Sequence, residues 1–527
     1  MEFSEHIKTA NVEDVVLRRP FYQPTKGTLC VTGHHLIFSN RGGDSARPFL
    51  LLLRNIDAIE KRPSVSSGTI TLKCKDLCVL QLDIPGMEEC LNIASSIESL
   101  SSLETVSEMY PFFYRPPFLS LQDQWGLSST EQHYAQMKEI HDGWRVSQVN
   151  RDYSVSPSYP PAVIVPHSID DETLVKAARF RQGGRFPVLC YYHRETGTVI
   201  MRSSQPLSGA NRKRCREDEL LLQAVIDGSE LGYIIDTRSS QQAQQARMTG
   251  GGFESKSCYR GWKRLHRQLE KGKVLQESLI KLVEACGDQS HSIAMLMMTV
   301  WFLCSISCYH VISVVMDGHS VLVHGSEGTD TSLLVSSLAQ LILDPDSRTL
   351  AGFLGLLERE WVQAGHPFQQ RCAHSAYSHV RLRHEAPVFV LLLDCVWQLA
   401  RQFPLAMGFS EPLLLRLAKE VYASDYGTFL CNSDQERCVT GVKERTHCLF
   451  QSLLRANERQ HYSNPLYERT ELAIWPSIQP PSLQLWKGLF LQWTDDALHL
   501  VEAQKVIQNL VSQCHRPLNE KVENTDG

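Results

Sequence analysis

The most constraining feature of this sequence is a strand-like run that leads through a short polar loop into a helix-like run. Residues 320–324 read Ser-Val-Leu-Val-His, as a buried strand would, and residues 333–343 have the apolar spacing of a helix. The unpaired N–H groups and the dipole at a helix N-terminus favour a bound anion. The sequence therefore predicts a phosphate-cradle geometry around residues 325–332.

Strand-like and helix-like runs alternate on both sides of this loop. The short β-rich runs are residues 187–192, 199–201, 232–236 and 320–324, and the long amphipathic runs are residues 274–286, 332–343 and 353–363. Strands separated by helices are typical of an α/β sheet that helices cover on both faces.

The first hundred residues have a different order, with strands first and one helix last. Two hairpin-like pairs are expected at residues 28–31 with 35–39 and at residues 69–74 with 78–82. After Pro85-Gly86, apolar residues recur at helical spacing on one side, namely Cys90, Leu91, Ala94, Ile97 and Leu100. A sheet followed by a single helix is the order of a pleckstrin-homology-type barrel.

Composition excludes several classes of protein. Hydrophobic residues make up 43% of the 527, which is typical of a chain with globular cores. The net charge of −5 and the absence of a basic stripe with interleaved aromatics argue against a nucleic-acid partner. The 16 cysteines include no C-x2-C pair, so no structural zinc site is expected. No signal peptide is recognisable at the N-terminus, so we expect free thiols in the cytosol.

One uncharged segment needs its own explanation. Residues 293–315 contain no Asp, Glu, Lys or Arg, and this length is sufficient to span a bilayer. The segment also holds His310 and has no basic flank to fix an orientation. We therefore favour a buried helix that runs into a core strand over a membrane span.

The loop lacks the groups that phosphoryl transfer would need. Such a site requires a low-pKa thiolate at the start of the loop and an arginine at its end that clamps the phosphate. Gly325 and Thr331 occupy these positions. Three C-x5-R strings elsewhere begin at Cys258, Cys395 and Cys431, and with 16 cysteines we interpret them as accidental.

The loop resembles that of the myotubularin family of phosphoinositide 3-phosphatases, whose motif is His-Cys-Ser-Asp-Gly-Trp-Asp-Arg-Thr. Four positions of the motif are retained, namely His324, Ser326, Gly328 and Asp330. Three are replaced by other residues, namely Glu327, Thr329 and Ser332. Gly325 and Thr331 stand where the family has cysteine and arginine. The chain is therefore identified as a catalytically inactive member of this family.

The resemblance extends along nearly the whole chain. Its further motifs lie at residues 183–188, 201–206, 352–353, 360–361, 365–368, 393–398, 426–430 and 472–477. The first hundred residues, with Gly27-Thr28-Leu29 and residues 34–38, resemble the family's PH-GRAM domain.

The resemblance implies a β-barrel PH-GRAM domain followed by an α/β protein-tyrosine-phosphatase-like domain of the myotubularin type. We expect the PH-GRAM domain at residues 1–105 and a linker and strap, rich in Ser and Pro, at residues 106–160. The inactive phosphatase-like domain is expected at residues 161–495, with an atypical apolar insert at 287–319. Residues 496–527 are expected to form a short helix and polar tail, a truncated coiled coil.

The function implied is that of a pseudophosphatase adaptor. Its partners would be active myotubularin-related phosphatases in a hetero-oligomer, and phosphoinositide membranes as a further surface. The resemblance places such a protein in the cytoplasm and peripherally on endomembranes, in phosphoinositide metabolism, endosomal traffic and autophagy, with no cofactor and no metal. The alternatives are a weakly active or lipid-sensing protein, or a non-functional variant disrupted at residues 287–319.

Two further expectations concern charge. The best candidates for contact with an anionic lipid surface are basic residues of the first domain, namely Arg18, Arg19, Lys61 and Arg62. In the loop, Glu327 and Asp330 are expected to cap the following helix and to repel an incoming phosphate, with no arginine to offset them.

Overall fold

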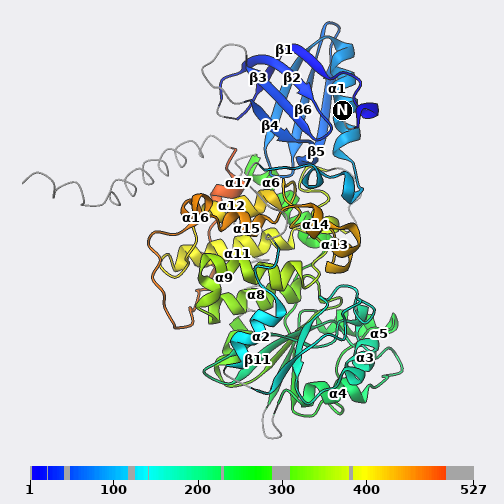
Figure 1. The fold of residues 1–527 in the computed structure, drawn as a ribbon, viewed down its shortest axis with the longest axis vertical. Helices are drawn as coiled ribbons and strands as arrows, with labels where there is room; N and C mark the ends of the chain where they lie inside the picture. Colours follow the sequence, from blue (N-terminus) through cyan, green and yellow to red (C-terminus); the bar gives the residue numbers. More distant parts are fainter. Residues whose placement is uncertain are drawn as a thin grey trace, which may run out of the picture.

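The computed structural model describes residues 3–20, 22–40, 48–116, 125–139, 142–226, 231–287, 309–378 and 384–493. Figure 1 shows the N-terminal sheet at one end of the molecule, a layer of helices in the middle and a second sheet toward the other end.

The N-terminal domain is an antiparallel sheet closed by one helix. The sheet order is β4-β3-β2-β1-β7-β6-β5, and its strands are β1 Asn11–Arg18, β2 Thr25–Val31, β3 His35–Asn40, β4 Phe49–Leu52, β5 Ile56–Pro63, β6 Ser67–Cys74 and β7 Val79–Pro85. Two short 3-10 helices, η1 Ser4–His6 and η2 Leu53–Asn55, lie before β1 and before β5. Helix α1, Met87–Ser101, packs Cys90, Ala94, Ile97 and Leu100 of the predicted face into the core of this domain, whereas the predicted Leu91 is exposed and Ile93 is buried in its place. The predicted order of strands and helix is confirmed.

The segment after α1 differs from the linker expected at residues 106–160. It contains 3-10 helices η3 Val106–Glu108 and η4 Tyr110–Phe112, helix α2 Thr130–Lys138, and strand β8 Trp144–Ser147, which pairs with β9 Val163–Pro166. Helix α2 begins at a capping box in which Ser129 accepts from the Gln132 amide and Gln132 accepts from the Ser129 amide. Local capping therefore creates a helix in a segment whose composition disfavours one.

The second sheet has the order β10-β11-β14-β12-β13. Its strands are β10 Val188–His193, β11 Thr198–Ser203, β12 Gly232–Asp236, β13 Trp262–His266 and β14 Val321–His324. Strands β11, β14, β12 and β13 are parallel, and β10 is antiparallel to β11. The sequence analysis missed β13, because its Trp-Lys-Arg-Leu-His lacks the apolar character of the other strands.

Both faces of this sheet are buried, as the alternating pattern predicted. In β14, Val321 and Val323 pack into the core with the central helices, whereas Leu322 packs on the opposite side with residues such as Trp262. Helix α8, Thr331–Leu343, is buried along its whole length, which explains its nearly continuous apolar sequence. The expected helix at 274–286 is α6, Lys273–Gly287. The run at 353–363 divides into α9 Leu350–Leu357 and a π-helix, η7 Glu358–Val362.

The remaining elements complete the helical layer and the sheet's outer cover. Around the sheet lie α3 Asp171–Arg179, η5 Gln182–Gly184, α4 Arg216–Gln223 and α5 Ser240–Met248. In and around the middle layer lie η6 Asp346–Arg348, α10 Phe368–Arg371, α11 Val388–Gln402, α12 Glu411–Glu420, α13 Asp434–Thr440, α14 Val442–Arg445, α15 Leu449–Leu453, α16 Ala456–Tyr462, η8 Pro480–Ser482 and α17 Lys487–Phe490.

The uncharged segment is only partly described. Residues 309–316 are helical, and Val311, Ile312 and Val315 pack into the central core. Residues 288–308 lie outside the described part of the chain, as do residues 494–527, on which the truncated coiled coil was predicted. Within the described residues, no helix is long and apolar enough to cross a membrane.

The N-terminal domain docks on the helical layer through a buried carboxylate. Asp57, at the start of β5, accepts hydrogen bonds from three backbone amides: Ser375 (2.9 Å), Tyr377 (2.8 Å) and Ser378 (3.0 Å). Burial alone would raise the pKa of Asp57, but His374 and these amides lower it below its usual value. The ionised carboxylate therefore joins the two domains.

We expect Asp57→Asn to lower the free energy of unfolding by about 2–4 kcal/mol. The asparagine amide has only one acceptor oxygen, so it cannot accept from Ser375 at one position and from Tyr377 and Ser378 at the other. Since the folded-state pKa is depressed, the difference from wild type should be full above about pH 4 and shrink as the pH falls further. Thermal unfolding across pH measures it. The exposed, paired Asp14 provides the control Asp14→Asn, and equal losses in both variants would contradict the docking role.

Candidate functional site

The candidate site lies at the carboxyl edge of the parallel sheet. In the register of the strands, His324 of β14 lies beside Ser203 of β11 and Asp236 of β12. The loop of residues 325–330 leaves this edge and enters α8 at Thr331. This edge of an open α/β sheet is where ligands generally bind, so the fold places the predicted cradle at the usual position of a site.

Contacts from other segments to its carbonyl groups hold the loop. Arg185 Nη2 donates to the Gly328 carbonyl at 2.7 Å, the Gln205 amide donates to Ser326 O at 3.1 Å, and the His366 Nδ1 lies 2.8 Å from Thr329 O. No residue in the described ranges accepts a hydrogen bond from the amides of residues 326–330. The backbone thus retains the donor arrangement of an anion cradle.

Gly328 is required by the backbone itself. Its φ of +74° lies in the left-handed region, and a Cβ at this position would stand 2.4 Å from the Ser203 carbonyl oxygen. Any other residue would therefore push the loop away from β11.

The two positions that lack the reactive groups face a pair of hydroxyls. Thr237, which follows β12, lies with its Oγ1 2.7 Å from the Oγ1 of Thr331. A Cβ built on Gly325 would lie 2.7 Å from Thr237 Oγ1 and 3.2 Å from Thr331 Oγ1. This hydroxyl pair therefore occupies space that a side chain at position 325 would need. The sequence analysis missed Thr237, which is 88 positions away along the chain from Gly325.

The expectation that no arginine offsets the loop's carboxylates is wrong. Arg371, at the end of α10, forms a two-pronged contact with Asp330, with Nε 3.0 Å from Oδ1 and Nη2 2.8 Å from Oδ2. Asp330 sits at the N-cap position of α8, but its side chain makes no capping hydrogen bond. Burial alone would raise its pKa, but His366 and Arg371 hold that pKa well below the usual value.

The remaining polar groups of the loop differ in exposure. Glu327 is two-thirds exposed and lies 3.8 Å from Arg371. Ser326 Oγ accepts from Lys271 Nζ at 2.8 Å. Ser332 is fully buried and its hydroxyl has no partner within the described structure. Three cations, Arg185, Lys271 and Arg371, therefore reach the loop from segments that the sequence pattern does not connect with it.

His324 belongs to a buried ion network. Its Nε2 lies 3.0 Å from Glu254, whose other oxygen accepts from Arg181 at 2.6 Å, and Arg181 also pairs with Asp218 at 2.7 Å. Burial alone would raise the pKa of Glu254, but His324 and Arg181 lower it strongly. His324 is thus fully committed to Glu254 and to the Gly325 carbonyl.

None of the three C-x5-R cysteines lies at the carboxyl end of a strand. Cys395 is buried within α11, and burial raises the pKa of Cys431 above its usual value. Reactive cysteines have depressed pKa values instead. Cys258 lies in the turn that leads into β13, before the first residue of that strand and not at the carboxyl end of one.

The structure does not bring the four lipid-binding candidates together. Arg18 pairs with Asp83 at 2.8 Å, and Lys61 pairs with Glu98 at 2.7 Å. Arg19 stacks on the rings of Tyr22 and Phe49, and Arg62 is largely exposed. Strands β7 and β6 separate the two arginines at the end of β1 from the pair on β5. Their role in lipid contact stays a prediction.

Comparisons with known proteins agree with this architecture. Residues 109–438 match the family model described as "Myotubularin-like phosphatase domain", and residues 11–101 match "MTMR6-9, GRAM domain". The chain is 55% identical to a Bos taurus protein named myotubularin-related protein 9-like, over 94% of this chain and 93% of the relative. It is 52% identical to Mus musculus myotubularin-related protein 9, over 99% and 97%.

A more distant relative carries the name of an enzyme. The chain is 33% identical to the Gallus gallus protein named phosphatidylinositol-3,5-bisphosphate 3-phosphatase MTMR8, over 99% of this chain and 84% of that protein.

We expect Gly325→Cys to destabilise the protein by about 1–3 kcal/mol, because its Cβ would crowd the Thr237 hydroxyl. Thr237→Ala in the same background should recover most of this loss. Denaturant unfolding of the single and double variants measures the coupling. Thr173→Ala, on the remote helix α3, is the matched control. Strict additivity of Gly325→Cys and Thr237→Ala would contradict the close approach.

Proposed function

The chain belongs to the myotubularin family, and we propose that it acts there as a catalytically inactive adaptor. In this role it is a regulatory subunit of active myotubularin-related phosphoinositide 3-phosphatases. The observation that carries the proposal is the content of the loop, where Gly325 and Thr331 replace the nucleophile and the phosphate clamp.

The absence of these two groups removes both the nucleophile and the group that stabilises the transferring phosphoryl group. A phosphatase of this type needs a thiolate that forms a bond to phosphorus, and glycine offers no atom for it. It also needs a guanidinium that stabilises the charge of the transferring phosphoryl group, and the Thr331 hydroxyl is uncharged and engaged with Thr237.

The electrostatics of Asp330 argue in the same direction. A general acid must carry a proton at working pH. Arg371 and His366 hold the Asp330 carboxyl in its ionised form, with a pKa well below its usual value. The loop therefore lacks a proton donor at this position as well.

An adaptor role is supported by what the chain has kept. The loop backbone, the buried network beneath it and the two-domain arrangement remain in place without the reactive groups. A phosphatase-like fold that is kept without its catalytic groups points to a role in binding other proteins. Because relatives over nearly the full length of this chain include a named phosphatase, active members of the family are the partners we infer. They would place it in phosphoinositide metabolism, endosomal traffic and autophagy, on the cytoplasmic face of endomembranes.

A second candidate is a lipid sensor that uses the loop itself. It is favoured by the unpartnered amides of residues 326–330 and by Lys271 near Ser326. It is opposed by the carboxylate of Glu327, which is two-thirds exposed, whereas Asp330 is already paired with Arg371. We rank it below the adaptor.

The purified full-length chain should release no phosphate from 3-phosphorylated phosphoinositides above a protein-free blank. Malachite-green detection with short-chain soluble lipids measures it, with an active relative as positive control. Phosphate release that Ser326→Ala abolishes would overturn the assignment as inactive.

The full-length chain should co-purify with active myotubularin-related phosphatases and change their turnover of phosphoinositides. A pull-down from purified components, followed by size-exclusion chromatography, measures it. Gly325→Cys/Thr237→Ala should associate as the wild type does, because the proposed role does not use the loop's chemistry. Failure to associate with any active member would contradict the adaptor role.

A further inference from the structure

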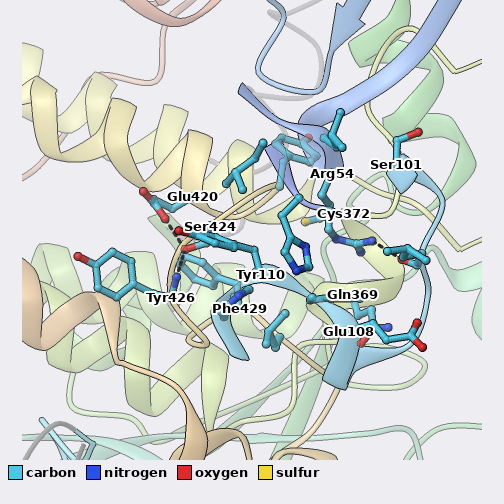
Figure 2. Close-up of a pocket in the computed structure, with 18 of the residues that line it drawn as sticks. Arg54, Ser101, Glu108, Tyr110, Gln369, Cys372, Glu420, Ser424, Tyr426 and Phe429 are labelled. Carbon is cyan, nitrogen blue, oxygen red and sulfur yellow. Dashed lines mark hydrogen bonds between the residues drawn. The ribbon is translucent and has the colours of Figure 1, made fainter. Parts of the chain in front are cut away.

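The junction between the two domains contains a groove of about 670 Å³, and none of the residues that line it belongs to the loop of residues 325–330. Its walls come from the N-terminal domain on one side and from the segment around α10 on the other. The cationic and imidazole groups that line it are Arg54, Lys75, His374 and His384. A smaller cavity shares Arg54 with the groove, and Figure 2 shows Arg54 reaching into this junction near Cys372.

Lys75 is the unusual residue of this groove. It is 3% exposed, and no carboxylate within the described residues lies within ion-pair distance of its ammonium group. Buried ammonium groups are almost always paired, because removing an uncompensated charge from water is costly. Burial, with Arg54 nearby, lowers the pKa of Lys75 to about 7, against the opposing effect of Asp57.

The nearest candidate counter-ion is already fully used. Asp57 accepts from three backbone amides, its side chain is completely buried, and it lies 3.4 Å from His374. Glu98, which also lines the groove, pairs with Lys61 at 2.7 Å. Glu104 and Glu385 complete the acidic part of the lining. Lys75 therefore has no direct ion-pair partner among the described residues, and it lies beside a space large enough for a ligand.

We propose that this groove binds a phosphate group, carried by a soluble phosphorylated metabolite or by a lipid headgroup, with Lys75 and Arg54 as its ligands. Lysine is a compact point charge suited to phosphate, and arginine adds directed donors. The acidic residues on the lining favour a single phosphate group over an extended polyanion, because a long polyanion would also meet Glu104 and Glu385.

Such a ligand would stabilise the docking of the two domains. The groove is made from both domains, so a phosphate bound in it contacts the sheet through Lys75 and lies against the segment that Asp57 holds. Binding to the folded, docked state alone raises the apparent stability of the protein.

The test uses the full-length chain and three probes at equal ionic strength. These are inorganic phosphate, the soluble monophosphate glycerol 3-phosphate, and phosphatidylcholine vesicles with and without a phosphatidylinositol monophosphate. Isothermal titration, vesicle flotation and the rise in melting temperature report binding. Binding of the soluble probes identifies a free phosphorylated molecule as the source, and binding of the vesicles alone identifies a headgroup; either supports the proposal.

Lys75→Met should weaken binding about tenfold, as expected for one charged hydrogen bond. It should also raise or preserve the melting temperature without ligand, because it removes a buried unpaired charge. The control Lys26→Met makes the same charge change at an exposed, paired residue of the same domain and should bind as wild type. If Lys75→Met does not fold, Arg54→Gln is the second variant, with the same expected loss.

Three outcomes would overturn the proposal. The first is no binding of any probe by the wild type. The second is an equal loss in Lys26→Met and Lys75→Met, which would indicate a general charge effect. The third is a loss in Ser326→Ala but not in Lys75→Met, which would assign the anion to the loop instead.

Discussion

The position of the loop depends on a buried ion network centred on Arg181. Its guanidinium pairs with Asp218 on one side and with Glu254 on the other, and Glu254 holds His324 at the end of β14. All four side chains are almost completely buried. Removal of one partner from such a network leaves a buried charge uncompensated, at a cost of about 3–5 kcal/mol. These ion pairs therefore hold His324, and with it the start of the loop, in position.

The loop shows that backbone shape and reactive chemistry are separable. Contacts from Arg185, Gln205 and His366 hold its carbonyl groups, and Gly328 supplies the one backbone conformation that the close approach to β11 requires. None of these contacts involves the side chains of positions 325 and 331. The backbone of the loop can therefore keep its shape whatever side chains stand at positions 325 and 331.

The junction between the domains is built by a different principle. The carboxylate of Asp57 accepts hydrogen bonds from three backbone amides in residues 375–378. This satisfies donors that would otherwise be buried without acceptors. The amides occupy the oxygens of Asp57, so Lys75 feels the charge of Asp57 but forms no direct ion pair with it, although the two side chains line one groove. The hydrogen bonds of Asp57 to these amides thus join the two domains and also keep Lys75 out of a direct ion pair.

The sequence by itself determined the local features. Hydrophobic patterns of period 2 and 3.6 among neighbouring residues reveal the apolar runs of β14 and α8 and the sheet-then-helix order of the first hundred residues. Residue identity alone reveals that a thiolate is missing at Gly325 and a guanidinium at Thr331. Only the tertiary structure decided that Arg371 neutralises Asp330, that Thr237 stands beside Gly325, and that Lys75 faces a groove. These contacts join residues tens to hundreds of positions apart, and no local pattern encodes such a pairing, because it is fixed by how the sheet and helices pack.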